Sequence, residues 1–518
     1  MRLLSVFALG LVLGISACSD TAASDDPEND DPARPGGKKD GGPNGDDDDD
    51  TTTPGDDDDD DGPPATCTMN PDVALNFEER RLVNRLPGKD VPFATEILTG
   101  TGFDVFERDF SARLCQDGKA GANSFEKAKE LVKGEGTKLW RAAVDRVQGK
   151  RTMGTLPAGD DRMLYWARLT MTKTLRAWEP SFALTAEQRG DLEWELERAS
   201  RGQYDLNLPA GPDFVRIVLS GFDPFTLGAP GATNDVNIRI GNPSGAAALA
   251  YDGVTFTLPN GKTAQIETYT LPVNYGPFER GMEEDTLGPV FQAPVDSRAN
   301  VAITMSQGSG YRFKLEEYNG RFHGTFEGND DVATCASGFL ASTTGCAIDP
   351  PARWLGYEPR PWAKDKPPQF VESSLPVDAM IAANTSAQVP APAGTPGGRF
   401  EVVWGYDFEV FPDCTKSATQ VFYSSVPYPP APGRQPPAAA ACARSGSGGD
   451  YLSNESAYRA TLLRDVLGLT IPVGHIHTPI MTRFSSGNGA VTDATFEAYR
   501  AAIVAQGRLL VEVVAKSL

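Results

Sequence analysis

Basic side chains are in the minority in this chain of 518 residues. It holds 48 Lys and Arg against 70 Asp and Glu, which gives a formal net charge of −22. Nucleic-acid binding needs a stripe of clustered positive charge, so we expect no nucleic-acid partner. The acidic excess is uneven, because residues 19–66 carry 18 acidic and three basic side chains, a charge of −15. The rest of the chain is only mildly acidic.

The apolar run at the start of the chain is too short to cross a bilayer as a stable helix. Residues 1–18 read MRLLSVFALGLVLGISAC, with one Arg before the run and small residues after it. This pattern is typical of a secretory signal. Its end, Ile15–Cys18, resembles a bacterial lipobox, in which the cysteine is lipidated; the alternative is an ordinary signal peptide cut near Ala17. A lipidated Cys18 predicts an exported protein held on the bacterial cell envelope, in the periplasm or on the cell surface, by a lipid anchor in the membrane.

Cysteines are few, and no two of them have the CxxC spacing of zinc or redox sites. We therefore predict no metal and no cofactor. Six cysteines remain when Cys18 is set aside, and an even number in an exported chain suggests disulfides. Proximity in the sequence favours three pairs: Cys67–Cys115, Cys335–Cys346 and Cys414–Cys442.

Composition divides the chain into four parts. Residues 1–18 are the predicted lipoprotein signal peptide. Residues 19–66 contain two long Asp runs that cannot bury apolar surface, which predicts a disordered acidic tether; calcium binding by these runs is the weaker alternative. Residues 67–208 place apolar side chains three and four apart, which predicts a small helical domain. Within it, Thr185 and Gln188 have the spacing of a capping box.

Strands and helices alternate from residue 209 to the end. The apolar run Phe214–Leu219 predicts a buried strand, and Asn242 followed by Pro243 predicts a helix start. Further strands are predicted within 264–276, 300–310 and 399–408, and helices within 375–384, 453–468 and 494–518. This alternation predicts an α/β domain over 209–518, with a mostly parallel sheet covered on both faces, a three-layer α/β/α arrangement. Ranges 335–370 and 387–445 are rich in Pro, Gly and Ala, so we expect loop insertions pinned by disulfides.

Three short segments could combine into a catalytic site. KLEEYN ends a predicted strand with two acidic residues, DYLSNESAYR begins a helix at Ser453, and GHIHTP ends a strand with His477. A hydroxyl nucleophile needs a base, and the base needs an acceptor that orients it. A helix N-terminus beside Ser453 would also favour an oxyanion. The alternative is that Ser453 serves only as an N-cap.

These segments resemble the pyroglutamyl peptidase I family. SGFDPF (220–225) with NPS (242–244) is similar to that family's GFEPF…NPS, and SGSGGDYLSNESAYR is similar to SNDAGRYLCNYVYYR. SQGSGYRFKLEEYN and GHIHTP are similar to two further motifs, in the same order. The resemblance covers roughly residues 213–518, interrupted by insertions.

The resemblance implies a hydrolase on an α/β/α fold that removes N-terminal pyroglutamate through a Glu-Cys-His triad. His477 takes the place of the base, and Ser453 stands where the family has its nucleophilic cysteine. The acid is Glu316 if strand alternation sets the register, and Glu317 if the segment is counted without a gap; alternation favours Glu316. Phe222, Phe225 and Gln307 correspond to the lining of the pyroglutamate pocket. The family's Arg-bearing segment after the glutamate has no recognisable counterpart.

Two functions follow from this sequence. The first is a membrane-anchored hydrolase that cleaves a small peptide or amide, such as an N-terminal pyroglutamyl bond, through Ser453, His477 and Glu316. The second is a catalytically inactive binding or structural lipoprotein derived from such an enzyme. We expect His477 to be exposed, and His475 either to face the other side of the same strand or to support packing.

Overall fold

The computed structural model describes residues 67–116, 121–322, 324, 326–332, 367–411, 424–426, 436–439, 441–481, 483–485 and 489–518. The described residues, from Cys67 onward, belong to one compact unit. The predicted signal peptide with Cys18, the acidic tether and most of the 335–370 insertion lie outside the described residues. Within the described part of the chain, no helix combines the length and apolar character needed to span a bilayer.

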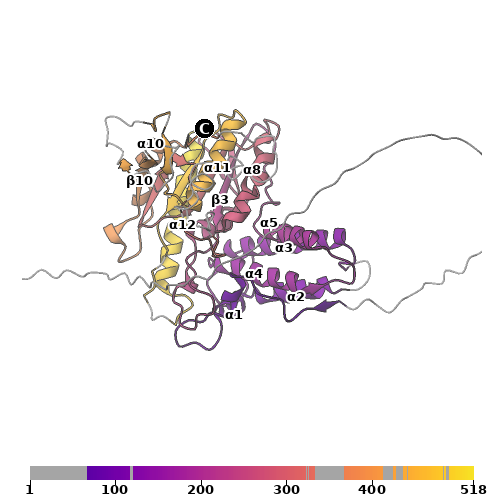
Figure 1. Ribbon diagram of the computed structural model, residues 1–518. Helices are drawn as coiled ribbons and strands as arrows, with labels where there is room; N and C mark the ends of the chain where they lie inside the picture. Colours follow the sequence, from indigo (N-terminus) through magenta and orange to yellow (C-terminus); the bar gives the residue numbers. More distant parts are fainter. Residues whose placement is uncertain are drawn as a thin grey trace, which may run out of the picture. The chain divides into compact units, whose positions relative to one another are not determined.

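Residues 67–208 form a group of helices, coloured purple in Figure 1. The capping box at the start of the last helix is confirmed, since the Thr185 side chain accepts from the Gln188 N–H and the Gln188 side chain accepts from the Thr185 N–H. Trp140 and Trp166 are fully buried among leucines, so the apolar stripes of these helices form a core. The helices are α1 (Phe93–Thr101), α2 (Asp104–Leu114), α3 (Phe125–Val147), α4 (Arg162–Ala177) and α5 (Ala186–Ala199), preceded by the 3-10 turn η1 (Glu79–Val83).

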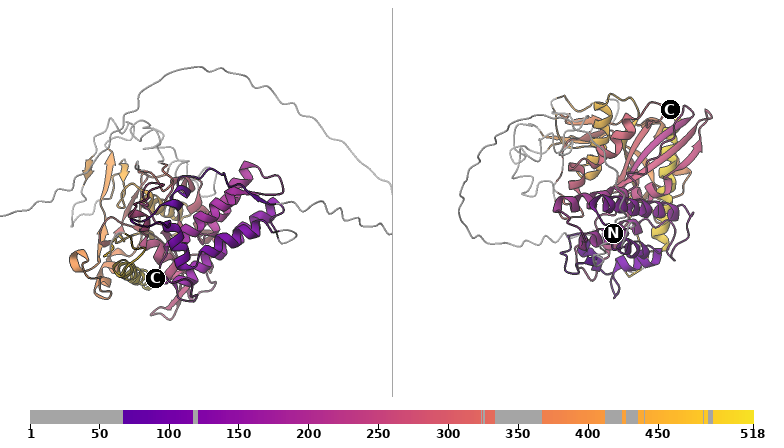
Figure 2. Two further views of the ribbon diagram at one scale, coloured as in Figure 1. Left: turned by 90° about the horizontal axis from the view of Figure 1, so that it is seen from below. Right: turned by 90° about the vertical axis from the view of Figure 1, so that its right-hand side faces the viewer.

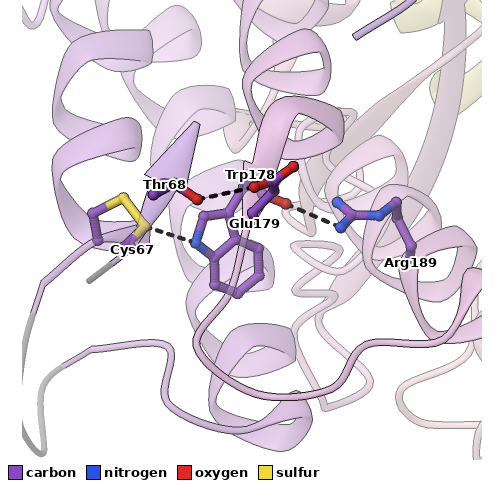
Figure 3. The surroundings of a disulfide bond; sticks show 6 residues. Cys67, Thr68, Trp178, Glu179 and Arg189 are labelled. Carbon is purple, nitrogen blue, oxygen red and sulfur yellow. Dashed lines mark hydrogen bonds between the residues drawn. A yellow bond between two sulfur atoms is a disulfide. The ribbon is translucent and has the colours of Figure 1, made fainter. Parts of the chain in front are cut away.

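A disulfide closes the start of this helical region. Cys67 is bonded to Cys115 at the end of α2, which confirms that predicted pair. The indole Nε1 of Trp178 donates a hydrogen bond to the Cys67 sulfur over 3.1 Å (Figure 3). The short strands β1 (Thr68–Met69) and β2 (Trp178–Glu179) pair beside it. Cys442 is also disulfide-bonded, whereas Cys335, Cys346 and Cys414 lie outside the described residues.

A sheet of seven strands forms the centre of the rest of the chain. Its order is β10 (Glu401–Gly405), β7 (Arg312–Glu316), β14 (Val473–Thr478), β6 (Val301–Gln307), β3 (Phe214–Phe222), β5 (Thr263–Leu271) and β4 (Val254–Thr257). The four strands β14, β6, β3 and β5 run parallel, whereas β7 is antiparallel to β14 and β4 is antiparallel to β5. β10 lies within the range 387–445, so part of that predicted loop insertion belongs to the main sheet.

Helices cover both faces of the sheet, which confirms the predicted α/β class. One core joins the strands to α6 (Pro243–Tyr251) and α12 (Ala494–Lys516), and a second core joins them to α8 (Met282–Gln292) and α11 (Leu452–Val466). The long helix α12, in yellow, runs beside the strands of the sheet in the right-hand view of Figure 2. The start of α6 is as predicted, with Asn242 as N-cap and Pro243 in the first turn.

Smaller elements complete this part of the chain. The short sheets pair β8 with β9, and β11 with both β12 and β13. They are built from β8 (Tyr318–Gly320), β9 (Phe370–Glu372), β11 (Phe408–Phe411), β12 (Ser424–Val426) and β13 (Cys442–Ser445), and the short helices are α7 (Tyr275–Glu279) and α10 (Val377–Ala382). Single turns of 3-10 helix occur at η3 (Asn237–Arg239), η4 (Thr385–Ala387) and η5 (Pro396–Gly398).

Candidate active site

Both histidines of strand β14 lie on the same side of the sheet. His475 and His477 are two residues apart, and side chains with that spacing share a face of a strand. Their rings contact edge to face, with centroids 4.9 Å apart. The expectation that His475 faces away from His477 is therefore wrong. The expected exposure of His477 is also wrong, since only 9% of the residue is exposed.

Glu316 and His477 form a close carboxylate–imidazole pair. The pair joins Glu316 Oε1 to His477 Nδ1, and Glu316 is completely buried. Burial by itself raises the pKa of Glu316, but His477, together with His475 and Lys314, outweighs this effect and lowers the pKa to about 2. Because β7 runs antiparallel to β14, Glu316 lies directly across from His475 and reaches His477 diagonally. The structure thus joins Glu316, rather than Glu317, to the histidine.

His475, next to the Glu316–His477 pair, lies between two hydroxyl groups. Thr304 Oγ1 is 2.7 Å from His475 Nδ1, and Ser306 Oγ is 2.7 Å from His475 Nε2. Burial disfavours the charged imidazole and lowers the pKa of His475 to about 3, against the opposing effect of Glu316. A neutral ring with both nitrogens engaged is a poor general base. His475 instead packs against His477 and supports its orientation.

Ser453 is the second residue of α11 and is not its cap. The N-cap is Tyr451, and no side chain caps the helix start. Ser453 Oγ donates to the Gly448 carbonyl oxygen over 3.4 Å, so it does not accept from a helix N–H as a capping serine would. Ser453 and His477 line the same cavity of about 1420 Å³, although they do not hydrogen-bond each other. The capping alternative therefore does not explain Ser453.

A glycine-rich loop, residues 446–449, leads into Ser453 and lies against the acid. A Cβ atom on Gly448 would overlap the Glu316 carboxylate, so only glycine allows this approach. The loop is held by Lys314, whose Nζ donates to the Ser447 carbonyl oxygen over 2.5 Å. The Ser447 side chain also accepts from the Tyr318 N–H. Glu316, His477 and the loop that leads to Ser453 are thus linked by contacts between β7, β14 and residues 446–449.

The three residues predicted to bind substrate line one small cavity beside Ser453. Phe222, Phe225 and Gln307 border a space of about 30 Å³ that Ser453 also lines. Gln307 Oε1 accepts from the Met481 N–H over 2.9 Å, and no described residue accepts from its amide nitrogen. Such a space holds roughly two water molecules. The Gln307 amide nitrogen can donate to a polar atom that enters this space.

The NPS segment fixes one wall of this cavity. Ser244 Oγ accepts from the Phe222 N–H over 3.0 Å and donates to Asn242 Oδ1 over 2.7 Å. Asn242 Nδ2 in turn donates to the Asp223 carbonyl oxygen over 2.9 Å. The Phe222 ring stacks on Phe278, with centroids 6.2 Å apart. The motif thus holds Phe222 against the start of α6.

Glu316, His475 and His477 could also hold a metal ion. Each offers one ligand atom, and these atoms lie within 4.8 Å of one another. A metal ion would have to displace the Glu316–His477 contact or a hydroxyl from His475. The sequence predicts no metal here, and the chemistry proposed below uses these side chains without one.

Two features of the site have no signal in the sequence motifs. One is Lys314, which pairs with Asp407 over 2.8 Å and holds the glycine-rich loop. It could be found only from its position two residues before Glu316 on the same strand face. The other is a pair of arginines from the helical region, Arg168 and Arg201, which contact Asp223. They lie 55 and 22 positions before Asp223 in the sequence. No local sequence pattern predicts that they pair with it.

Comparisons with known proteins give the family of this chain. The model of the PA0049 C-terminal domain matches residues 216–482, and that of the PA0049 N-terminal domain matches residues 59–197. Protein PA0049 of Pseudomonas aeruginosa strain PAO1 is 46% identical over 501 residues, which cover 86% of this chain and 90% of that protein. The chain therefore belongs to the PA0049 family.

Solved structures with some similarity are pyrrolidone carboxyl peptidases. A mutant of the Pyrococcus furiosus enzyme is 16% identical, covering 59% of this chain and 100% of its own, with a TM-score of 0.33. The enzyme from Fervidobacterium islandicum AW-1 is 14% identical, covering 57% of this chain and 97% of its own, with a TM-score of 0.30.

Proposed function

We propose that this protein is a hydrolase in which Ser453 is the nucleophile, His477 the general base and Glu316 the residue that orients the base. The observation that carries the proposal is the buried contact between Glu316 and His477 Nδ1, in a cavity that Ser453 also lines. A carboxylate on Nδ1 fixes the tautomer that leaves Nε2 free to take a proton.

The first chemical step is attack of Ser453 Oγ on a carbonyl carbon. Before attack, Oγ turns from the Gly448 carbonyl toward His477, and catalytic hydrogen bonds are often long before substrate binds. His477 takes the hydroxyl proton as the C–O bond forms. It then gives the proton to the leaving amine or alkoxide as the scissile bond breaks. Water repeats the sequence and releases the acid.

The start of α11 offers a place for the oxyanion. The N–H groups of Leu452 and Ser453 come before the first intrahelical bond, which runs from Glu455 N to Tyr451 O. No side chain caps them. Backbone N–H groups at a helix N-terminus stabilise developing negative charge, and the helix dipole adds to this effect.

The substrate class that we favour is an N-terminal pyroglutamyl amide or another small acyl amide. Support comes from the motifs shared with pyroglutamyl peptidases and from the small cavity, bordered by Phe222 and Phe225, in which Gln307 offers a donor. A panel of fluorogenic amides and esters tests this proposal. Pyroglutamyl amide should be cleaved faster than alanyl or phenylalanyl amides, and Ser453→Cys should retain that preference.

The alternative is an inactive binding protein that keeps the cavity. If neither the natural protein nor Ser453→Cys cleaves any member of the panel, the hydrolase proposal fails. If esters are cleaved without preference for a small acyl group, the hydrolase stands and the pyroglutamyl substrate is rejected.

We also propose that the protein is exported and anchored by lipid on Cys18. The support is the signal-like segment 1–18 with its lipobox-like end and the acidic tether that follows. The full chain expressed in a Gram-negative host should pellet with membranes, and Cys18→Ala should move it to the soluble exported fraction. Continued pelleting of Cys18→Ala would contradict the anchor.

A further inference from the structure

We propose that the helical region sets the acyl selectivity of the site by clamping the loop after β3, residues 223–228, through buried arginines. This inference rests on the proposed hydrolase function, and it assigns a role to residues that are far from the reacting atoms. The loop begins at Asp223, between Phe222 and Phe225, the two aromatic residues that line the small cavity.

Two arginines of the helical region converge on one carboxylate oxygen. Arg168 Nη2 and Arg201 Nη2 lie 2.5 Å and 2.7 Å from Asp223 Oδ2, and all three side chains are at least 95% buried. Glu197 contacts both arginines, over 3.6 Å to Arg168 and 2.6 Å to Arg201. Charge-assisted hydrogen bonds are stronger than neutral ones when they are shielded from water. The clamp therefore fixes where the loop leaves the sheet.

A third arginine holds the far end of the same loop. Arg81 Nε donates to the Gly228 carbonyl oxygen over 2.8 Å, and Arg81 Nη1 donates to the Asn329 carbonyl oxygen over 2.5 Å. The Asn329 side chain donates to the Pro224 carbonyl oxygen over 2.8 Å. The loop is thus held at its first residue, its second residue and its last residue. The arginines that hold the two ends belong to the helical region, and Arg81 also binds Asn329, which holds the second residue.

The backbone inside the loop shows that these contacts impose a conformation. Thr226 has a φ of 60°, a left-handed conformation that a β-branched residue rarely adopts. Such a conformation persists only where surrounding contacts enforce it. Its neighbour Phe225 borders both cavities at the site. We infer that the arginines hold the loop in this conformation and thereby place the Phe225 ring beside Ser453.

The clamp acts on binding of the acyl group and not on proton transfer. Arg168, Arg201 and Arg81 do not line either cavity, and the Glu316–His477 pair lies on other strands. These arginines are positioning residues. Loosening them should raise KM for a small acyl substrate, while kcat changes little.

The test compares Asp223→Asn with Asp160→Asn, which weakens an equally buried aspartate–arginine pair away from the loop. Asp223→Asn should raise KM for the best small acyl amide about tenfold and change kcat less than about threefold. Arg201→Met should likewise raise KM with little change in kcat. Arg201→Lys, which keeps the positive charge, should have a KM close to the native value. Similar kinetics for Asp223→Asn and Asp160→Asn would overturn the inference.

Hydrogen exchange separates this inference from the proposed function. The backbone amides of 222–228 should exchange faster in Asp223→Asn than in the native protein, and at the native rate in Asp160→Asn. Exchange rates do not depend on turnover. They therefore test whether the arginines order the loop even if the natural protein shows no Ser453-dependent activity. If exchange in 222–228 is unchanged in both Asp223→Asn and Arg201→Met, the arginines do not order the loop. Arg201→Met keeps the Arg168–Asp223 pair and serves if Asp223→Asn does not fold.

Discussion

Ser453→Ala should lower the rate of ester or amide hydrolysis by at least about 10⁴-fold, because the variant lacks the hydroxyl that attacks the carbonyl. His475 cannot substitute, since both of its nitrogens contact hydroxyls. Binding of substrate should be nearly unchanged, because the small cavity keeps its walls. The measurement is kcat and KM of the native and variant proteins on the best substrate of the panel.

A matched control for this variant is Ser456→Ala. Ser456 lies one turn further along α11, and its hydroxyl donates to the Ser453 carbonyl oxygen over 3.1 Å. It lines neither cavity, so its loss should change kcat less than about threefold if the helix start is undisturbed. Equal turnover by the native protein and Ser453→Ala would remove Ser453 from the mechanism, and a similar loss in both variants would mean that the helix, and not the hydroxyl, matters.

Glu316→Gln should lower kcat by roughly 10²- to 10⁴-fold with little change in KM. The carboxylate accepts from His477 Nδ1 and stabilises the imidazolium that forms as Ser453 loses its proton. The neutral amide of glutamine is a weaker acceptor and stabilises the imidazolium less. Its NH₂ group can also face His477 Nδ1, and that group donates rather than accepts. The lowered pKa of about 2 keeps Glu316 ionised from mildly acidic to alkaline pH, so the loss should be present across that whole range. The measurement is the pH profile of kcat for both proteins.

Glu317→Gln is the natural control for Glu316→Gln. The two glutamates are adjacent in the sequence, and Glu316 is the one that pairs with His477, through its Oε1 and the ring Nδ1. We expect Glu317→Gln to keep kcat within about threefold of the native value. A larger loss of kcat in Glu317→Gln than in Glu316→Gln would show that Glu317, and not Glu316, orients His477.

The parts of the site that could be predicted are those set by local pattern. Strand alternation through Phe313 and Leu315 favours Glu316 over Glu317, and the contact with His477 has that register. The α6 start at Asn242 and the capping box at Thr185 depend on residues only a few positions apart, and both form as expected.

The parts that could not be predicted depend on pairing between distant segments. The antiparallel direction of β7 is set by its neighbours β14 and β10, and no local signal gives it. The wrong side assigned to His475 has a different origin, since residues two apart on a strand share a face whatever the pairing. The contacts of Arg168 and Arg201 with Asp223 arise only when the helical region packs against the loop.

Ser453 also illustrates how structure separates two roles that look alike in sequence. A serine near a helix start is most often a cap, and the sequence alone cannot place the cap to the residue. Here Tyr451 occupies that position, and Ser453 is turned toward Gly448 at the edge of the cavity. Ser453 therefore has no capping role, and the feature to test is that it lines the same cavity as His477.

The most direct test of the account is the intact mass of the protein after incubation with a serine-reactive fluorophosphonate. The account predicts one added phosphonyl group, mapped to Ser453 by peptide mass spectrometry, and no addition to Ser453→Ala. It also predicts much slower addition to Glu316→Gln, because the probe reacts only with a serine activated by its base. No addition to the native protein, or equal addition to native protein and Ser453→Ala, would contradict the claim that Ser453 is an activated nucleophile.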